Sequence, residues 1–151
     1  MTDFEAVWEL VHDTLAERFD AHVTDDNFRF DRTKFAVPTG SSTLFVKVAQ
    51  RRRSQPVIVK IWSWLLTSAK PSPELFEYLA FSGERFDVGH LHATPGGPEP
   101  GARVNVTFTH NFLGEHLDAE SFTAVLRLMM DAADELDDEL QDLFGGFRWT
   151  D

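Results

Sequence analysis

The chain of 151 residues contains no cysteine, and this absence removes two kinds of site at once. Disulfide bonds and zinc sites built on thiolates are excluded, and the composition fits a reducing compartment. Long apolar runs are also missing: none approaches the about 20 residues that cross a bilayer, and no basic region precedes an apolar segment at the N-terminus. We therefore predict a cytoplasmic protein that does not enter membranes.

Positive charge is scarce as well. Lysine and arginine number 14 against 25 aspartate and glutamate residues, which gives a formal net charge of −11. This surplus of negative charge repels phosphate backbones, and the only basic run, 51–53, falls in an expected hairpin loop. We predict an acidic protein with a single domain over 1–151 that does not bind nucleic acid directly.

Signatures of catalysis are absent too. The chain has no Gly-x-Ser-x-Gly motif, no thiol nucleophile and no glycine loop between a strand and a helix. His90 and His92 alternate along one expected strand and could bind a metal, with His110 as a third ligand. We interpret the pair instead as side chains of a half-exposed strand, and His110 as a hydrogen-bonded residue at the edge of the core. The sequence predicts neither an enzyme nor a metal or cofactor site.

Strong helical periodicity is present at both ends of the chain. Apolar residues recur at steps of three and four near the N-terminus, which predicts a first helix over about 3–19. A long helix is predicted from Asp118, a suitable N-cap, to a stop at Gly145-Gly146. Its apolar stripe consists of Phe122, Val125, Leu126, Met129, Ala133, Leu136, Leu140 and Leu143. A short helix between these two is opened by Ser72-Pro73 and ends near 81–83.

Alternating apolar and polar residues predict the strands. They are expected at 27–31 continuing into 35–37, then at Thr43–Ala49, 57–66, 86–93 and 104–112. The segment 94–101 is rich in proline and glycine and is expected to form a loop. The resulting order, α-β-β-β-α-β-β-α, predicts an α+β domain: an antiparallel sheet of about five strands with the helices packed on it.

An acidic run occupies the polar side of the long helix. Its members are Asp131, Asp134, Glu135, Asp137, Asp138, Glu139 and Asp142. A calcium site or a docking face for a basic peptide would be functional interpretations. Carboxylates fixed along a helix cannot surround a cation as a calcium loop does. We therefore interpret the run as a face exposed to solvent.

Aromatic residues are the most informative surplus. Trp62 and Trp64 fall on one side of the third expected strand with Lys60 and Leu66, whereas the other side is aliphatic and suits packing against helices. The neighbouring strands divide in the same way. The predicted protein-binding surface consists of Phe45, Lys47, Lys60, Trp62, Trp64, Thr107, Thr109 and Asn111. The alternative is that the chain's own second helix covers the tryptophans.

Several segments resemble the YbjN-like family of bacterial proteins, which shares its fold with type III secretion chaperones. They are Pro71-Ser-Pro-Glu-Leu-Phe-Glu-Tyr78, Gly89-His-Leu91, Val106-Thr-Phe-Thr-His110, Leu113-Gly-Glu-His-Leu-Asp118, Ala132-Ala-Asp-Glu-Leu-Asp-Asp-Glu-Leu140 and Phe144-Gly-Gly146. The resemblance covers about 70–146 in motif and the whole chain in the order of elements. It implies a small cytoplasmic protein with a peptide-binding or chaperone-like role, and it contains no catalytic signature.

Two functional hypotheses from different classes follow. In the first, the protein is a non-catalytic module that binds a peptide or protein client, by strand addition at a sheet edge or in a groove under the aromatic residues, with a chaperone-like or regulatory role. In the second, it is a stand-alone regulatory or structural homodimer whose aromatic face is buried by its own copy.

Overall fold

The computed structural model describes residues 3–23 and 34–148 of the chain. The elements in chain order are α1 (Phe4–Phe19), β1 (His22–Val23), β2 (Lys34–Pro38), β3 (Thr43–Ala49), β4 (Ile58–Ala69), α2 (Pro73–Phe81), the 3-10 helix η1 (Gly83–Arg85), β5 (His90–Pro95), β6 (Val104–Leu113), the 3-10 helix η2 (Gly114–His116) and α3 (Ala119–Phe144). This order confirms the predicted α+β fold class. The strand predicted over 27–31 lies outside the described residues.

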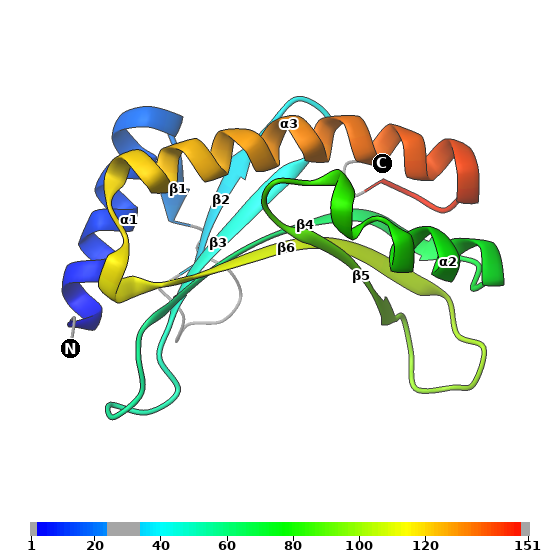
Figure 1. Ribbon diagram of the computed structural model, residues 1–151, viewed down its shortest axis with the longest axis horizontal. Coiled ribbons are helices and arrows are strands. Elements are labelled where there is room, and N and C mark those ends of the chain that lie inside the picture. Colours follow the sequence, from blue (N-terminus) through cyan, green and yellow to red (C-terminus); the bar gives the residue numbers. More distant parts are fainter. Residues whose placement is uncertain (1–2, 24–33, 149–151) are drawn as a thin grey trace.

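The strands form one antiparallel sheet in the order β1-β2-β3-β4-β6-β5. Its five longer strands, β2 to β6, correspond to the strands predicted from the sequence, and β1 adds two residues at one edge. Because β6 lies between β4 and β5, the chain leaves the sheet after β4, passes through α2 and η1, and returns at the opposite edge (Figure 1). β4 is therefore an interior strand with β3 on one side and β6 on the other.

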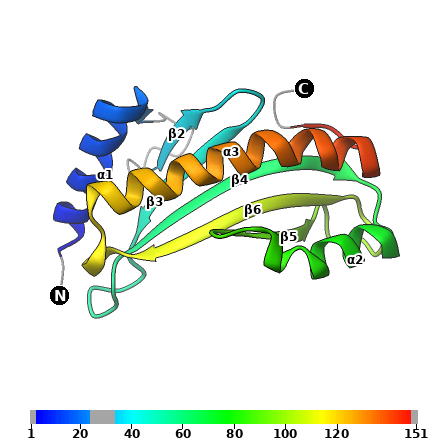
Figure 2. The ribbon, with the colours of Figure 1, turned by 45° about the horizontal axis from the view of Figure 1, so that its top comes forward.

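The three helices lie on the same face of the sheet (Figures 1 and 2). α3 packs across β4, and α1 packs against both α3 and β3. α2 and η1 lie beside the C-terminal half of α3, where the ring centres of Tyr78 and Phe144 are 5.5 Å apart and Arg85 binds Glu139. Hence α2 lies on the side opposite the tryptophans, and the alternative in which it covers them is wrong.

Local signals set the ends of α2 and α3 as predicted. The Asp118 carboxylate accepts a hydrogen bond from the backbone N–H three residues later at 2.9 Å, and the Ser72 hydroxyl does the same for α2 at 3.1 Å. Gly145 and Gly146 follow α3 with φ angles of 70° and 80°, a region that favours glycine. These caps satisfy backbone groups that would otherwise lack partners at the helix ends.

The stripe of α3 packs on the aliphatic side of the sheet and forms the core. Its fully buried members are Phe122, Leu126, Met129, Ala133, Leu136 and Leu140. Burying an aliphatic or aromatic side chain of this size stabilises the fold by about 1.5–3 kcal/mol relative to leaving it exposed. Leu143, which the sequence places in the same stripe, is 57% exposed and lines a hollow between α2 and α3.

β4 departs from simple alternation after Trp64. The pairing with β6 shifts register between Trp64 and Leu66, so that Leu65 and Leu66 are both buried. A bulge of this kind inserts an extra residue into one strand and turns the following side chains to the other side. The prediction that Leu66 shares the side of Trp62 and Trp64 is therefore wrong.

β5 begins at His90, four residues later than the sequence predicts. Gly89 just before it has a φ of 79°, and a Cβ at this position would lie 2.6 Å from the ring of Phe108. The ring of Phe86 packs on the same phenylalanine, with 5.1 Å between ring centres. Residues 86–89 therefore fold over β6 instead of pairing with it.

Candidate functional site

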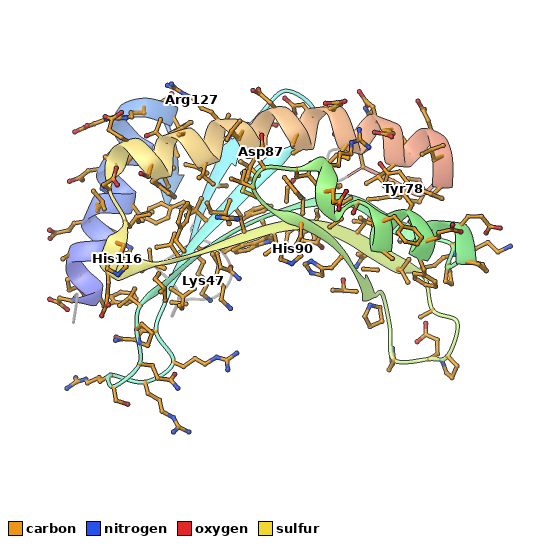
Figure 3. The ribbon with its side chains drawn as sticks, viewed as in Figure 1. Lys47, Tyr78, Asp87, His90, His116 and Arg127 are labelled. Carbon is orange, nitrogen blue, oxygen red and sulfur yellow. The ribbon has the colours of Figure 1, made fainter. Side chains whose placement is uncertain are left out.

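The pairing register places the eight predicted binding residues on one side of β3, β4 and β6. Their cross-strand rows are Phe45–Trp62–Thr109, Lys47–Lys60–Asn111 and Trp64–Thr107. We call the surface that these eight residues form the tryptophan face. Figure 3 shows Lys47 and His90 on this side of the sheet, away from α3. None of the described helices covers it.

Three aromatic side chains form the centre of the tryptophan face. The ring centre of Phe45 lies 5.6 Å from that of Trp62 and 5.0 Å from that of Trp64, and the two indoles are 6.2 Å apart. Lys34 Nζ lies 5.2 Å from the ring centre of Phe45 and 5.9 Å from that of Trp62, within cation–π range. Both tryptophans are half-buried. The cluster is a preformed apolar platform with a cation beside it.

Members of the tryptophan face differ in how much surface they expose. Lys60 and Asn111 are exposed, whereas Lys47 and Thr109 are half-buried. Phe45 is 7% exposed and Thr107 is 5% exposed. These last two residues lie on the predicted side, but little of their surface is exposed to a partner.

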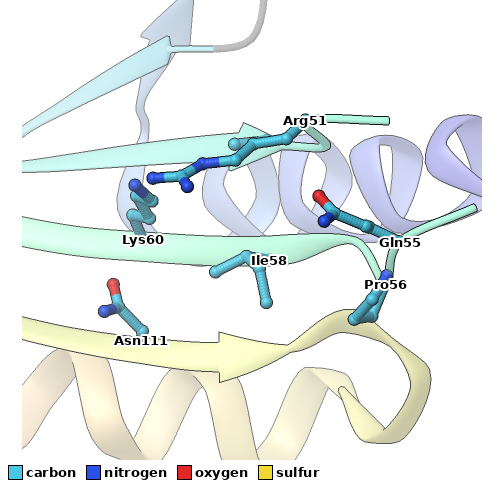
Figure 4. Close-up of a pocket in the computed structure, with 7 residues that line it drawn as sticks. Arg51, Gln55, Pro56, Ile58, Lys60 and Asn111 are labelled. Atoms are coloured by element: carbon cyan, nitrogen blue, oxygen red, sulfur yellow. The ribbon is translucent and has the colours of Figure 1, made fainter. Parts of the chain in front are cut away.

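One end of the tryptophan face is hollowed. The hollow has a volume of about 490 Å³ and is lined by Ala49, Arg51, Gln55, Pro56, Ile58, Lys60 and Asn111. Arg51, from the β3–β4 hairpin, extends back along β3 toward Lys60, and Asn111 points toward the same space from β6 (Figure 4). From the sequence, Arg51 is expected only as part of a basic loop. Its place beside Lys60 depends on how the hairpin folds back, which no sequence pattern revealed.

Charge is divided between the two sides of the sheet. Strands β2 to β6 contain no aspartate or glutamate, whereas Lys34, Lys47 and Lys60 occupy aligned positions in β2, β3 and β4. On the helix side, α3 alone carries eight acidic residues and a single arginine, Arg127. The described part of this acidic protein therefore has a basic sheet side and an acidic helix side.

The acidic run of α3 is more than a solvated face, contrary to the interpretation from sequence. Asp134 accepts hydrogen bonds from the Thr39 hydroxyl at 2.6 Å and from the backbone N–H groups of Gly40 and Ser41 at 3.2 Å. Asp137 is 1% exposed and accepts from the Ser41 hydroxyl at 3.0 Å, while its second oxygen is buried and has no hydrogen-bond partner among the described residues. Burial raises the pKa of the Asp137 carboxyl. Both residues fasten the turn between β2 and β3 to α3.

Two arginines compensate further members of the run. Arg85 in η1 donates hydrogen bonds to Glu139 at 2.5 and 3.0 Å and lies 3.5 Å from Glu135. The hydrogen bond from Arg85 lowers the pKa of Glu139. Arg148 donates to Asp138 at 2.6 Å. No local sequence pattern predicts these ion pairs, because the two partners of each pair lie at least ten residues apart along the chain.

The histidines of β5 and β6 do not form a metal site in the part of the chain that the structure describes. The ring centres of His90 and His92 are 5.7 Å apart, and burial, followed by the proximity of His90, lowers the pKa of His92. His110 Nδ1 accepts a hydrogen bond from the backbone N–H of Gly89 at 3.2 Å, as expected for a histidine at the edge of the core. Within residues 3–23 and 34–148, no three potential ligand side chains are arranged to hold a metal ion.

Comparison with known families gives a match over nearly the whole chain. The family model TY-Chap1, described as T3SS (YopN, CesT) and YbjN peptide-binding chaperone 1, matches residues 5–151. Peptide-binding chaperones are a non-enzymatic kind of protein. No curated protein matches the chain. Among the described helices, none combines the length and the apolar character needed to cross a membrane.

Proposed function

Because the chain belongs to this family of peptide-binding chaperones, we propose that it holds a segment of a client polypeptide on the tryptophan face. The observation that carries the proposal is the cluster of Phe45, Trp62 and Trp64, which lies on the side of the sheet without described helices. Each tryptophan ring buries on the order of 200 Å² when it is fully covered, so a half-buried pair retains apolar area for a partner. An aromatic centre with a polar rim is typical of protein-binding surfaces.

The place of the cluster in the sheet favours one mode of binding. β4 has β6 and β5 between it and one edge of the sheet and at least β3 and β2 between it and the other, and neighbouring strands are about 4.8 Å apart. A peptide that extended the sheet at either edge would lie at least about 14 Å from β4, too far for its side chains to reach Trp62. We therefore propose that the client lies across the tryptophan face and does not add a strand to the sheet.

Replacement of Trp62 by alanine tests the proposal. A suitable probe is a fluorescent peptide of repeated Gln-Ser-Leu-Ser, whose leucines share one side when it is extended, with binding followed by anisotropy. Trp62→Ala should retain the fold and weaken binding about 30-fold, or about 2 kcal/mol, as truncation of an aromatic hot spot does. Phe81→Ala, at a side chain 79% exposed on α2, is the matched control and should bind like the wild type. If Trp62→Ala bound the peptide as tightly as Phe81→Ala and the wild type do, the tryptophan face would not be the binding site.

A second candidate function is a stand-alone homodimer without a client. Exposed apolar side chains favour it: Phe81 and Leu143 line a hollow of about 650 Å³ between α2 and α3, and Phe76 and Phe147 are exposed nearby in the sequence. A second copy of the chain could cover such apolar surface. Sedimentation velocity across a range of concentrations tests this candidate, with Phe81→Asp expected to weaken self-association. A chain that stays monomeric throughout would eliminate it.

We also propose that the protein acts in the cytoplasm and that it does not bind nucleic acid. The absence of cysteine and the net charge of −11 support these two statements. Cell fractionation tests the first, and a titration with a labelled oligonucleotide tests the second.

A further inference from the structure

Two positive charges converge in the hollow at the end of the tryptophan face. Lys60 is exposed on β4, and the Arg51 side chain returns along β3 toward it (Figure 4). Asn111 adds an amide from β6. No carboxylate within the described ranges lies within 4.0 Å of either cation. Like charges that share a hollow repel each other, and an anion placed between them would turn this repulsion into attraction.

The rest of the hollow indicates which anion fits. Its remaining lining is mostly aliphatic, from Ala49, Pro56 and Ile58, while Gln55 contributes a further amide. A group with an aliphatic stem and a charged tip matches such a lining, because the stem can cover the apolar floor while the tip meets the cations. The side chain of glutamate or aspartate has this form.

We infer that the hollow takes a carboxylate side chain of the client, and hence that the segment bound to the tryptophan face is acidic. This inference rests on the proposed function. Lys60 and Trp62 are two residues apart on the same side of β4, which separates them by about 6.6 Å. A client segment extended along β4 repeats this spacing. An acidic residue and a large apolar residue two positions apart would therefore meet Lys60 and Trp62 together.

The net charge of the whole protein does not oppose this selectivity at short range. At physiological ionic strength, exposed charges farther apart than about 8 Å are largely screened from each other. The acidic residues of α3 lie on the other side of the sheet, so among the described residues a peptide at the hollow meets Lys60 and Arg51 and not these carboxylates. A basic segment would be repelled at the same place.

Three peptides of equal length and apolar pattern test the inference: repeats of Glu-Ser-Leu-Ser, Gln-Ser-Leu-Ser and Lys-Ser-Leu-Ser. The glutamate peptide should bind the wild type about tenfold more tightly than the glutamine peptide, and the lysine peptide should bind most weakly. The differences in affinity among the three peptides should become smaller as NaCl is raised from roughly 20 to 500 mM, because these differences are electrostatic. Equal affinities at low salt, or preference for the lysine peptide, would overturn the inference.

Charge-reversal variants test whether the hollow causes the preference for the glutamate peptide. Lys60→Glu and Arg51→Glu should each lower the ratio of the affinity for the glutamate peptide to that for the glutamine peptide about tenfold. Both residues are exposed, so circular dichroism should show an intact fold. Arg103→Glu, which makes the same change of charge in the β5–β6 loop, is the matched control and should leave all three affinities nearly unchanged. A loss in the control equal to that in Lys60→Glu would mean that net charge, and not the hollow, selects the peptide.

The design separates failure of the inference from failure of the proposed function. If the wild type binds the three peptides equally and Trp62→Ala weakens all of them, the tryptophan face binds peptides without charge selection. If Trp62→Ala binds them like the wild type, the proposed function fails whatever the charge preference. Tighter binding of a single-stranded oligonucleotide than of the glutamate peptide would assign the hollow to phosphate and overturn the inference. Absence of binding by all probes at roughly 1 mM would overturn both proposals.

Discussion

Asp134 and Asp137 lie one turn apart on α3 and bind the same turn between β2 and β3, yet we expect their replacement by asparagine to have opposite effects. The substitution nearly preserves shape while it removes the charge and one acceptor oxygen. Asp134 uses both oxygens: Thr39 and Ser41 donate to one and Gly40 to the other. An asparagine has a single acceptor oxygen, so at least one of these hydrogen bonds must be lost.

The structure sets the expected size of each effect. Hydrogen bonds to a charged group contribute about 1.5–3 kcal/mol. Because the lost bond at Asp134 is near solvent and water can replace it in part, we expect Asp134→Asn to lower the free energy of unfolding by about 1–2 kcal/mol. Asp137 is buried, and one of its oxygens has no partner within residues 3–23 and 34–148; asparagine would retain the bond from Ser41 without a buried charge. Asp137→Asn should therefore raise the free energy of unfolding by about 1 kcal/mol at pH 7.

The raised pKa of Asp137 predicts how this difference changes with pH. Since the folded state binds the proton more readily than the unfolded state, the carboxyl stabilises the fold most in acid, and this contribution is lost as pH rises through the raised pKa. The advantage of Asp137→Asn over the wild type should be present at neutral pH and shrink as pH falls toward 3.8, the ordinary value for the group.

Urea unfolding followed by tryptophan fluorescence measures the free energy of unfolding of both variants at neutral and acidic pH. The comparison requires that this free energy fall with urea concentration at the same slope in each variant and in the wild type. A shift of 1 kcal/mol corresponds to about 2–4 °C in Tm for a chain of this size. If Asp137→Asn destabilised the fold as much as Asp134→Asn at pH 7, the reasoning from burial would be refuted.

Three further predictions concern the core, the loop before β5 and metal binding. Leu136→Asp should lower the free energy of unfolding by several kcal/mol, because position 136 is fully buried. This is a large part of the about 5–15 kcal/mol that stabilises a domain, and a variant that melted at the temperature of the wild type would contradict the prediction. Gly89→Ala should destabilise by about 1–3 kcal/mol through its positive φ and its contact with Phe108, whereas Gly83→Ala, with open space around it, should not. Zinc should not raise the Tm of the purified protein, and stoichiometric metal that survives dialysis would show that the histidines form a site after all.

Local chemistry was sufficient to predict the helices and, up to the bulge after Trp64, the two sides of β4. The caps at Ser72 and Asp118 and the glycine stop after α3 act on backbone groups within one turn, so their effect can be read from neighbouring residues. The side shared by Lys60 and Trp62 follows in the same way from the period of two in an extended strand. This much of the candidate site was therefore available from the sequence.

Tertiary structure decided which side chains stay accessible and which charges are compensated. Alternation could not show that Phe45 is buried, that a bulge turns Leu66 toward the helices, or that the β3–β4 hairpin returns Arg51 to Lys60. Nor could periodicity show that Asp137 is buried under the β2–β3 turn, since the turn lies about 100 residues earlier in the chain. Each of these outcomes depends on contacts between distant segments. A periodic pattern records only where a side chain points, and the fold determines what it meets there.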